Sequence, residues 1–149
     1  MNVSPRQNPA YRLSRSALRT LWHARWVLLL CIYAALVSGF SHMRLGGYGA
    51  PLFPGADKMF HVAEFAVFAF LAWRAFERRA LPALLTALAF AAVDELHQSF
   101  VPTRVASPFD GAADALGAML ALAVLRGGPR LWALLRRRIL EGTHSNRRT

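Results

Sequence analysis

Four long apolar runs dominate the chain, and shorter polar stretches separate them. Each run is close to the roughly 20 residues that an α-helix needs to cross the hydrocarbon core of a bilayer. The spacing of small and polar residues within the runs is helical. We therefore predict an all-α, polytopic membrane protein, a four-helix transmembrane bundle with helices over residues 26–43, 57–76, 81–98 and 110–125.

Glycine and proline mark the places where these helices are expected to end. Residues 46–55 contain four glycines and two prolines, so we expect an irregular loop there. Pro102 interrupts the pattern after the third helix, and Gly127-Gly128-Pro129 is expected to end the fourth. A cleaved signal peptide is the competing interpretation of the first run. It fits less well, because the basic segment before the run is long and the run continues to His42.

The C-terminal segment has a different character from the four runs. Residues 130–141 place leucines against arginines at helical spacing, which predicts a basic amphipathic C-terminal helix lying on the membrane surface. The chain then divides into a basic cytoplasmic N-terminal segment, a four-span transmembrane domain and a basic cytoplasmic amphipathic tail, over residues 1–25, 26–125 and 126–149.

Small residues recur every four positions on two of the predicted helices. Such a seam lets another helix approach closely, either within the chain or in a second copy of it. The seam residues are Ala83, Ala87 and Ala91 on the third helix and Ala113, Gly117 and Ala121 on the fourth.

The charge distribution predicts an orientation. The net charge is +10, from 18 bases and 8 acids, and most of the bases lie before residue 26 or after residue 125. Because they flank apolar spans, we expect the partners to be the lipid bilayer and anionic lipid at its cytoplasmic face, and we expect no nucleic-acid partner. The positive-inside rule places both termini in the cytoplasm of a multi-pass protein of the bacterial inner (cytoplasmic) membrane. The single cysteine, Cys31, excludes an intrachain disulfide.

This orientation gathers polar residues at the extracytoplasmic ends of three helices. Residues three, four or seven positions apart share one side of a helix, so each group should form a stripe. The polar set comprises Asp57, Lys58, His61 and Glu64 from the second helix, Asp94, Glu95 and Gln98 from the third, Arg104 from the next connection, and Asp110 and Asp114 from the fourth.

Two of these acids are expected to lie within the hydrocarbon. Glu64 is five residues beyond Met59, which corresponds to ~7.5 Å along a helix axis. An ionisable side chain at that depth is costly if it faces lipid. We therefore expect Glu64 and Asp114 to point into the bundle, where they can find polar partners.

The order and spacing of these residues resemble the VanZ-like family of small membrane proteins. The resemblance extends from about residue 58 to about residue 125. An asparagine is frequent in the family where this chain has Asp114. The resemblance implies a four-helix membrane domain from a family named for a protein associated with teicoplanin resistance, and it implies no particular reaction. It is carried by Asp57-Lys58-x-x-His61, by Asp94-Glu95-x-x-Gln98-x-Phe100-x-Pro102-x-Arg104 and by Asp110-x-x-x-Asp114-x-x-Gly117.

Six acids at the extracytoplasmic ends face only two permanent bases, Lys58 and Arg104. Carboxylates at a low-dielectric boundary cannot all remain ionised and unpaired. We therefore expect a proton, a metal or a ligand to supply positive charge there. A divalent metal is one candidate cofactor, and its candidate ligands are Asp57, Asp94 and Glu95.

One functional hypothesis is a membrane-embedded hydrolase or transferase that acts on a lipid-linked or cell-envelope substrate. In it, His61 or Glu64 is the general base, and Lys58 and Arg104 hold a phosphate or carboxylate. The chain contains no familiar catalytic motif, so this hypothesis depends on the grouping of residues alone. The catalytic candidates are His61, Glu64, Asp94 and Glu95.

Two alternatives stay open. In the first, the same polar ends bind an envelope-derived or glycopeptide ligand without turnover. In the second, Arg104 and Lys58 only lock the helix ends together by pairing with Asp94, Asp110 or Asp57. The favoured structural pair is Arg104 with Asp110. The residues assigned to this binding or structural network are Asp57, Lys58, Gln98, Arg104, Asp110 and Asp114.

Overall fold

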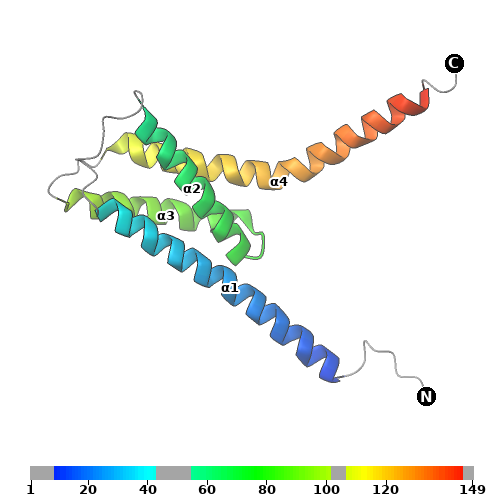
Figure 1. The fold of residues 1–149 in the computed structure, drawn as a ribbon, viewed down its shortest axis with the longest axis horizontal. Coiled ribbons are helices and arrows are strands. Elements are labelled where there is room, and N and C mark those ends of the chain that lie inside the picture. Colours follow the sequence, from blue (N-terminus) through cyan, green and yellow to red (C-terminus); the bar gives the residue numbers. More distant parts are fainter. Residues whose placement is uncertain (1–8, 43–54, 102–106, 146–149) are drawn as a thin grey trace.

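The computed structural model describes residues 9–42, 55–101 and 107–145, and every regular element in these ranges is an α-helix. Figure 1 shows α2, α3, the C-terminal part of α1 and the N-terminal part of α4 packed together, while the blue end of α1 and the red end of α4 extend away from them. The prediction of an all-α protein with four helices is confirmed. The helices are α1 (Pro9–His42), α2 (Ala56–Ala75), α3 (Ala80–Ser99) and α4 (Pro108–Ser145).

The two central helices have nearly the predicted bounds, but the outer two are longer. α1 begins at Pro9, well before residue 26, because the basic segment is rich in leucine, alanine and arginine, which favour helix. α4 runs through Gly127 and Gly128 to Ser145, so the break predicted there is absent, and residues 130–141 belong to α4. Pro129 lies inside α4, and Figure 1 shows a bend in its orange part. A proline removes one helical hydrogen bond and bends a helix without necessarily ending it.

Two of the predicted connections fall mostly outside the described residues. These are the glycine- and proline-rich loop, of which residues 46–54 are not described, and the connection from Pro102 to residue 106.

Within the described residues, three helical stretches are long and apolar enough to cross a membrane, namely Ser16–Phe40, Ala80–Ser99 and Pro108–Leu134. α2 has the length but carries more charge, including Asp57, Lys58, Glu64 and Arg74. It contacts each of the other three helices, and Ala69 and Ala72 are fully buried at 0% exposure. α2 is therefore the central helix, and its neighbours cover the side that carries Ala69 and Ala72.

The hydrophobic core is built from aromatic rings on α2 and α3 and from small residues. The rings of Phe68 and Phe90 stack with centroids 4.5 Å apart and an interplanar angle of 4°. Phe65 lies 5.8 Å from Phe68 and 5.9 Å from Phe90. The predicted seam residues Ala83 and Ala87 are fully buried within this chain, so this part of the seam serves intrachain packing.

α2 and α4 approach each other closely at Gly117. A Cβ atom built on Gly117 would lie 2.2 Å from the carbonyl oxygen of Val62 and 2.9 Å from the carbonyl carbon. Because the obstacle is the backbone of a packed helix, no side-chain rotation can relieve it. Gly117 thus sets the distance between the two helices that carry most of the polar residues.

The C-terminus of α2 has a backbone conformation that usually requires glycine. Glu77 and Arg78 have φ angles of 51° and 68°. The amide of Arg78 donates to the carbonyl of Trp73 at 2.7 Å, and that of Glu77 donates to the carbonyl of Arg74 at 3.3 Å. This is the Schellman pattern, in which glycine is favoured at the position of Glu77.

We expect Gly117→Ala to destabilise the protein by roughly 1–3 kcal/mol, because the added methyl group forces α2 and α4 apart. The measurement is the thermal unfolding of purified protein in detergent, followed by circular dichroism. Gly39→Ala is the matched control, since a Cβ atom at Gly39 meets no atom within 4 Å. Equal behaviour of the two variants would contradict the assignment of Gly117 as a close-contact residue.

Glu77→Gly should stabilise the protein by about 1 kcal/mol, because glycine adopts a positive φ without the Cβ penalty. The same unfolding measurement checks it. Glu77→Gln removes the charge and keeps the Cβ atom, so it should give no gain. A gain from the glutamine variant would show that charge, and not backbone conformation, limits stability at this turn.

Candidate functional site

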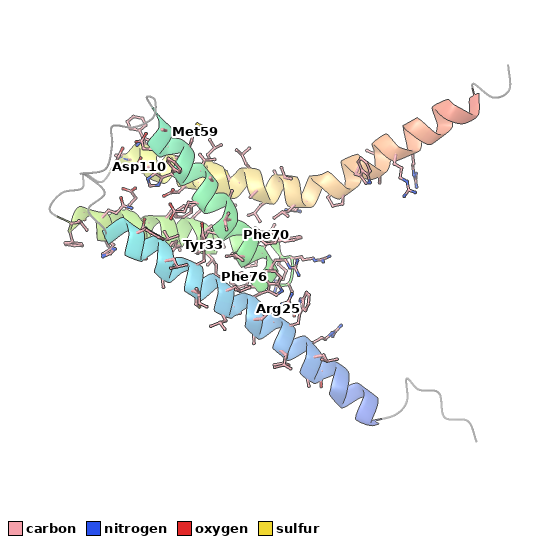
Figure 2. The ribbon with its side chains drawn as sticks, viewed as in Figure 1. Arg25, Tyr33, Met59, Phe70, Phe76 and Asp110 are labelled. Atoms are coloured by element: carbon pink, nitrogen blue, oxygen red, sulfur yellow. The ribbon has the colours of Figure 1, made fainter. Side chains whose placement is uncertain are left out.

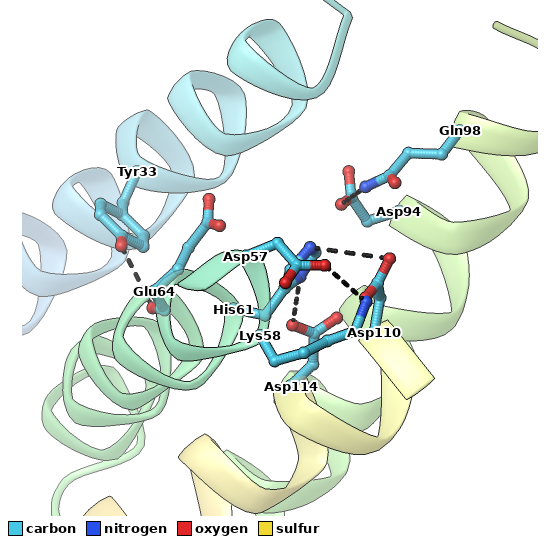
Figure 3. Close-up of polar contacts among 9 residues, drawn as sticks. All are labelled: Tyr33, Asp57, Lys58, His61, Glu64, Asp94, Gln98, Asp110 and Asp114. Carbon is cyan, nitrogen blue, oxygen red and sulfur yellow. Dashed lines mark hydrogen bonds and ion pairs between the residues drawn. The ribbon is translucent and has the colours of Figure 1, made fainter. Parts of the chain in front are cut away.

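Polar side chains from α2, α3 and α4 gather at one end of the bundle (Figure 2 labels Met59 and Asp110 there). Figure 3 shows most of them and the contacts that join α2 to α4. We call this group the polar cluster. It consists of Asp57, Lys58 and His61 of α2, Asp94, Glu95 and Gln98 of α3, and Asp110 and Asp114 of α4.

Lys58 joins the starts of α2 and α4. Its ammonium group donates a hydrogen bond to Asp110 and forms an ion pair with Asp57 at 2.9 Å. Lys58 and Asp57 precede the apolar stretch of α2, which begins at Met59. The hydrogen bonds to Asp110 and Asp57 raise the pKa of Lys58, and the bond from Lys58 lowers the pKa of Asp57. Lys58 and Asp57 are therefore charged near neutral pH.

His61 and Asp114 form the second link between α2 and α4. The Nδ1 atom of His61 lies 2.9 Å from Oδ1 of Asp114, and its Nε2 atom lies 3.9 Å from Oδ2 of Asp110. Asp114 is fully buried at 0% exposure. The ring of His61 is thus held between two carboxylates, in an orientation set by the buried one.

α3 contributes a third group of polar side chains. The amide of Gln98 donates to Oδ2 of Asp94 at 2.6 Å, and both residues are buried. Glu95 lies against the start of α4, where a Cβ atom on Gly111 would meet its Cγ atom at 3.7 Å. It is close enough to interact electrostatically with Asp110, Asp114 and His61.

Some carboxylate oxygens of the polar cluster, on α3 and α4, are buried without a hydrogen-bond donor among the described residues. They include Oδ2 of Asp114 and Oε1 of Glu95. Such an atom costs about 1–3 kcal/mol, and more when the group is charged. The polar cluster therefore has acceptor oxygens for a species that donates hydrogen bonds.

Glu64 lies beside the polar cluster, close enough to His61 to interact with it electrostatically. Figure 3 shows it on the side of α2 that faces Tyr33 of α1, whose hydroxyl donates to the backbone carbonyl of Glu64 at 3.1 Å. Sequence reasoning missed Tyr33. A signal was available, because a tyrosine inside an apolar span needs a polar partner for its hydroxyl group.

The predicted metal ligands are not brought together as a set. In residues 9–42, 55–101 and 107–145, no group of three His, Cys, Asp or Glu side chains is arranged to hold a metal ion. The ammonium of Lys58 occupies the position next to Asp57, while Asp94 is bonded to Gln98. The remaining predicted base, Arg104, lies outside the described residues, so its expected pairing with Asp110 stays a prediction.

A model of the VanZ/LLP1 family matches residues 7–133, which include the whole polar cluster and nearly all of the packed helices. The chain belongs to the VanZ/LLP1 family. Comparisons with curated proteins and with solved structures gave no match. Membership confirms the resemblance drawn from the motifs. Together with its long apolar helices, it makes this VanZ-like chain a multi-pass membrane protein.

The two partners of Lys58 should contribute unequally to stability in the VanZ-like fold. Asp110 has a side-chain exposure of 14%, whereas that of Asp57 is 58%. In double-mutant cycles, we expect Lys58→Met with Asp110→Asn to give a coupling energy of roughly 1–3 kcal/mol. The matched cycle with Asp57→Asn should give a smaller coupling energy, because exposed pairs are weak. Thermal unfolding measures both cycles, and a larger coupling to Asp57 would contradict this ranking.

Proposed function

We propose that this VanZ-like protein acts at the cell envelope by binding an amphiphilic molecule at the polar cluster, and that this binding alters susceptibility to teicoplanin. The proposal places the polar cluster at the extracytoplasmic face of the bacterial cytoplasmic membrane, with both termini in the cytoplasm. The basis for that orientation is the concentration of arginines in the terminal segments and at the turn between α2 and α3.

The observation that carries the proposal is an apolar groove that begins at the polar cluster. It has a volume of about 420 Å³ and lies between α2 and α4. Lys58 is its charged end, and Met59 is 62% exposed beside it. Ligand sites commonly combine an apolar wall with a few placed polar groups. The lining residues are Lys58, Met59, Val62, Ala63, Ala66, Ala113 and Leu116.

The charge of the polar cluster indicates which head group it would accept. Its carboxylates outnumber its bases, and buried oxygens of Asp114 and Glu95 lack donors among the described residues. An ionised carboxylate only accepts hydrogen bonds. The proposed ligand therefore carries a head group that donates them, such as an ammonium or a set of hydroxyl groups, attached to an apolar chain that lies in the groove.

A second candidate function is catalysis on a lipid-linked envelope substrate. It is favoured by the contact between Nδ1 of His61 and Asp114 at 2.9 Å, which resembles the way a carboxylate orients a catalytic histidine. His61 would then serve as general base through its other ring nitrogen. This function is a hydrolase or transferase activity, and it needs a substrate seated in the same groove.

Loss of a carboxylate charge in the polar cluster should weaken the proposed function. The assay compares the minimum inhibitory concentration of teicoplanin for a sensitive bacterium with and without the unaltered protein. We expect Asp114→Asn and Glu95→Gln each to remove most of that difference. The reason is that each charged hydrogen bond contributes about 1.5–3 kcal/mol, or roughly 10- to 150-fold in affinity. Glu77→Gln is the matched control, because it removes an acid at the other end of α2.

The level of each variant in the membrane, measured by immunoblot, separates loss of function from loss of protein. If Asp114→Asn and Glu77→Gln behave alike at equal levels, the polar cluster is not the site. His61→Gln distinguishes the two candidate functions. A binding site should keep part of its function with the uncharged amide, whereas a general base should lose nearly all of it.

A further inference from the structure

A second cavity lies at the opposite end of α2 from the polar cluster. It has a volume of about 650 Å³ and is formed by α1 and the C-terminal end of α2 with the turn that follows. Figure 2 labels Arg25 and Phe76 in this region of the bundle, far from Met59 and Asp110. We call it the basic cavity. Its lining residues are Leu18, Arg19, Trp22, His23, Arg74, Glu77 and Arg78.

The walls of the basic cavity carry excess positive charge. Three guanidinium groups, from Arg19, Arg74 and Arg78, face one carboxylate, that of Glu77. In the described part of the chain, none of the three arginines forms an ion pair. Their charges are therefore available to an anion, and guanidinium groups match the geometry of phosphate oxygens.

Tryptophan rings orient two of these guanidinium groups, and the guanidinium carbon of Arg78 lies 5.7 Å from the ring centroid of Trp73. The guanidinium carbon of Arg74 lies 4.0 Å from the ring centroid of Trp26 and 5.6 Å from that of Trp22. Arg25 lies 3.5 Å from the centroid of Trp22. Stacking on a ring orients a guanidinium group and leaves its charge and N–H donors unneutralised. The cavity is thus arranged in advance for an anion.

The backbone of the turn also brings charge to the basic cavity. Glu77 and Arg78, the two non-glycine residues with positive φ in the described ranges, both line it. The turn that ends α2 therefore places the side chains of Glu77 and Arg78 at the basic cavity.

The surroundings of the basic cavity favour a lipid over a soluble anion. Leu18 and Trp22 line the cavity and are 63% and 51% exposed, and Leu21 beside them is 67% exposed. Tryptophan is enriched at the level of lipid head groups, where its ring meets both water and acyl chains. An acyl chain can cover these apolar side chains while a head group reaches the arginines, and inorganic phosphate can do only the second.

From this arrangement, we propose that the basic cavity binds the phosphodiester of an anionic phospholipid, with Arg19, Arg74 and Arg78 around the phosphate and the lipid chain against Leu18 and Trp22. Basic pockets between membrane helices are known to take head groups of this kind. The site is separate from the polar cluster and does not depend on the function proposed for it.

The test is native mass spectrometry of the full-length protein in detergent, titrated with phosphatidylglycerol. We expect saturable binding of phosphatidylglycerol and at least about tenfold weaker binding after Arg19→Gln, because one charged hydrogen-bonding partner is lost. Arg19 stacks on no described ring, so this change leaves the packing of Trp22 and Trp26 intact. Arg78→Gln is the second variant and should act in the same direction.

The matched control is Arg136→Gln, which removes the same charge from an exposed position on the projecting part of α4. It should leave lipid binding unchanged, and circular dichroism should show equal helix content in all variants. Equal weakening by Arg136→Gln would overturn the site in favour of general charge attraction. Equal binding of phosphatidylcholine, or displacement of the lipid by equimolar inorganic phosphate, would overturn the anionic-lipid assignment.

Discussion

The polar cluster depends on how closely α2 and α4 can approach. At Gly117 there is no room for a side chain, and the backbone of Val62 fills the space. Beside Val62 on α2 and about one turn before Gly117 on α4, this approach allows the ring of His61 to reach Asp114, and further along it allows Lys58 to reach Asp110. The side chains of His61 and Asp114 are too short to bridge helices that bulky residues hold apart. The absence of a side chain at Gly117 thus determines the distances between the charged groups of α2 and α4.

Much of the fold could be predicted from the sequence, and the limits have physical causes. The bounds of α2 and α3 are within one residue of the prediction, because a glycine, basic residues or the polar run after Val93 mark their ends. The extent of α1 and α4 was not predictable from hydropathy, which reports where a helix meets lipid and not where it ends. Arginine and leucine continue a helix into water as readily as into a membrane.

The same distinction applies to the polar cluster. Spacing indicates which residues lie near one another around a single helix, since this depends only on the geometry of that helix. Which stripe faces which neighbour depends on how the helices cross. His61 and Glu64 are three residues apart and so differ by only about 60° around the axis of α2. That difference directs His61 to α4 and leaves Glu64 on the side facing α1. No pattern within a single helix contains this information.

α4 is one continuous helix of 38 residues. At 1.5 Å per residue it is about 57 Å long, nearly twice the ~30 Å of bilayer hydrocarbon. One helix therefore contains both Asp110, in its first turn, and the arginines near its C-terminal end. It bends near Pro129. Movements of the two ends of α4 are therefore mechanically coupled. A tilt of α4 at one end displaces its other end by an amount that grows with the length of the helix.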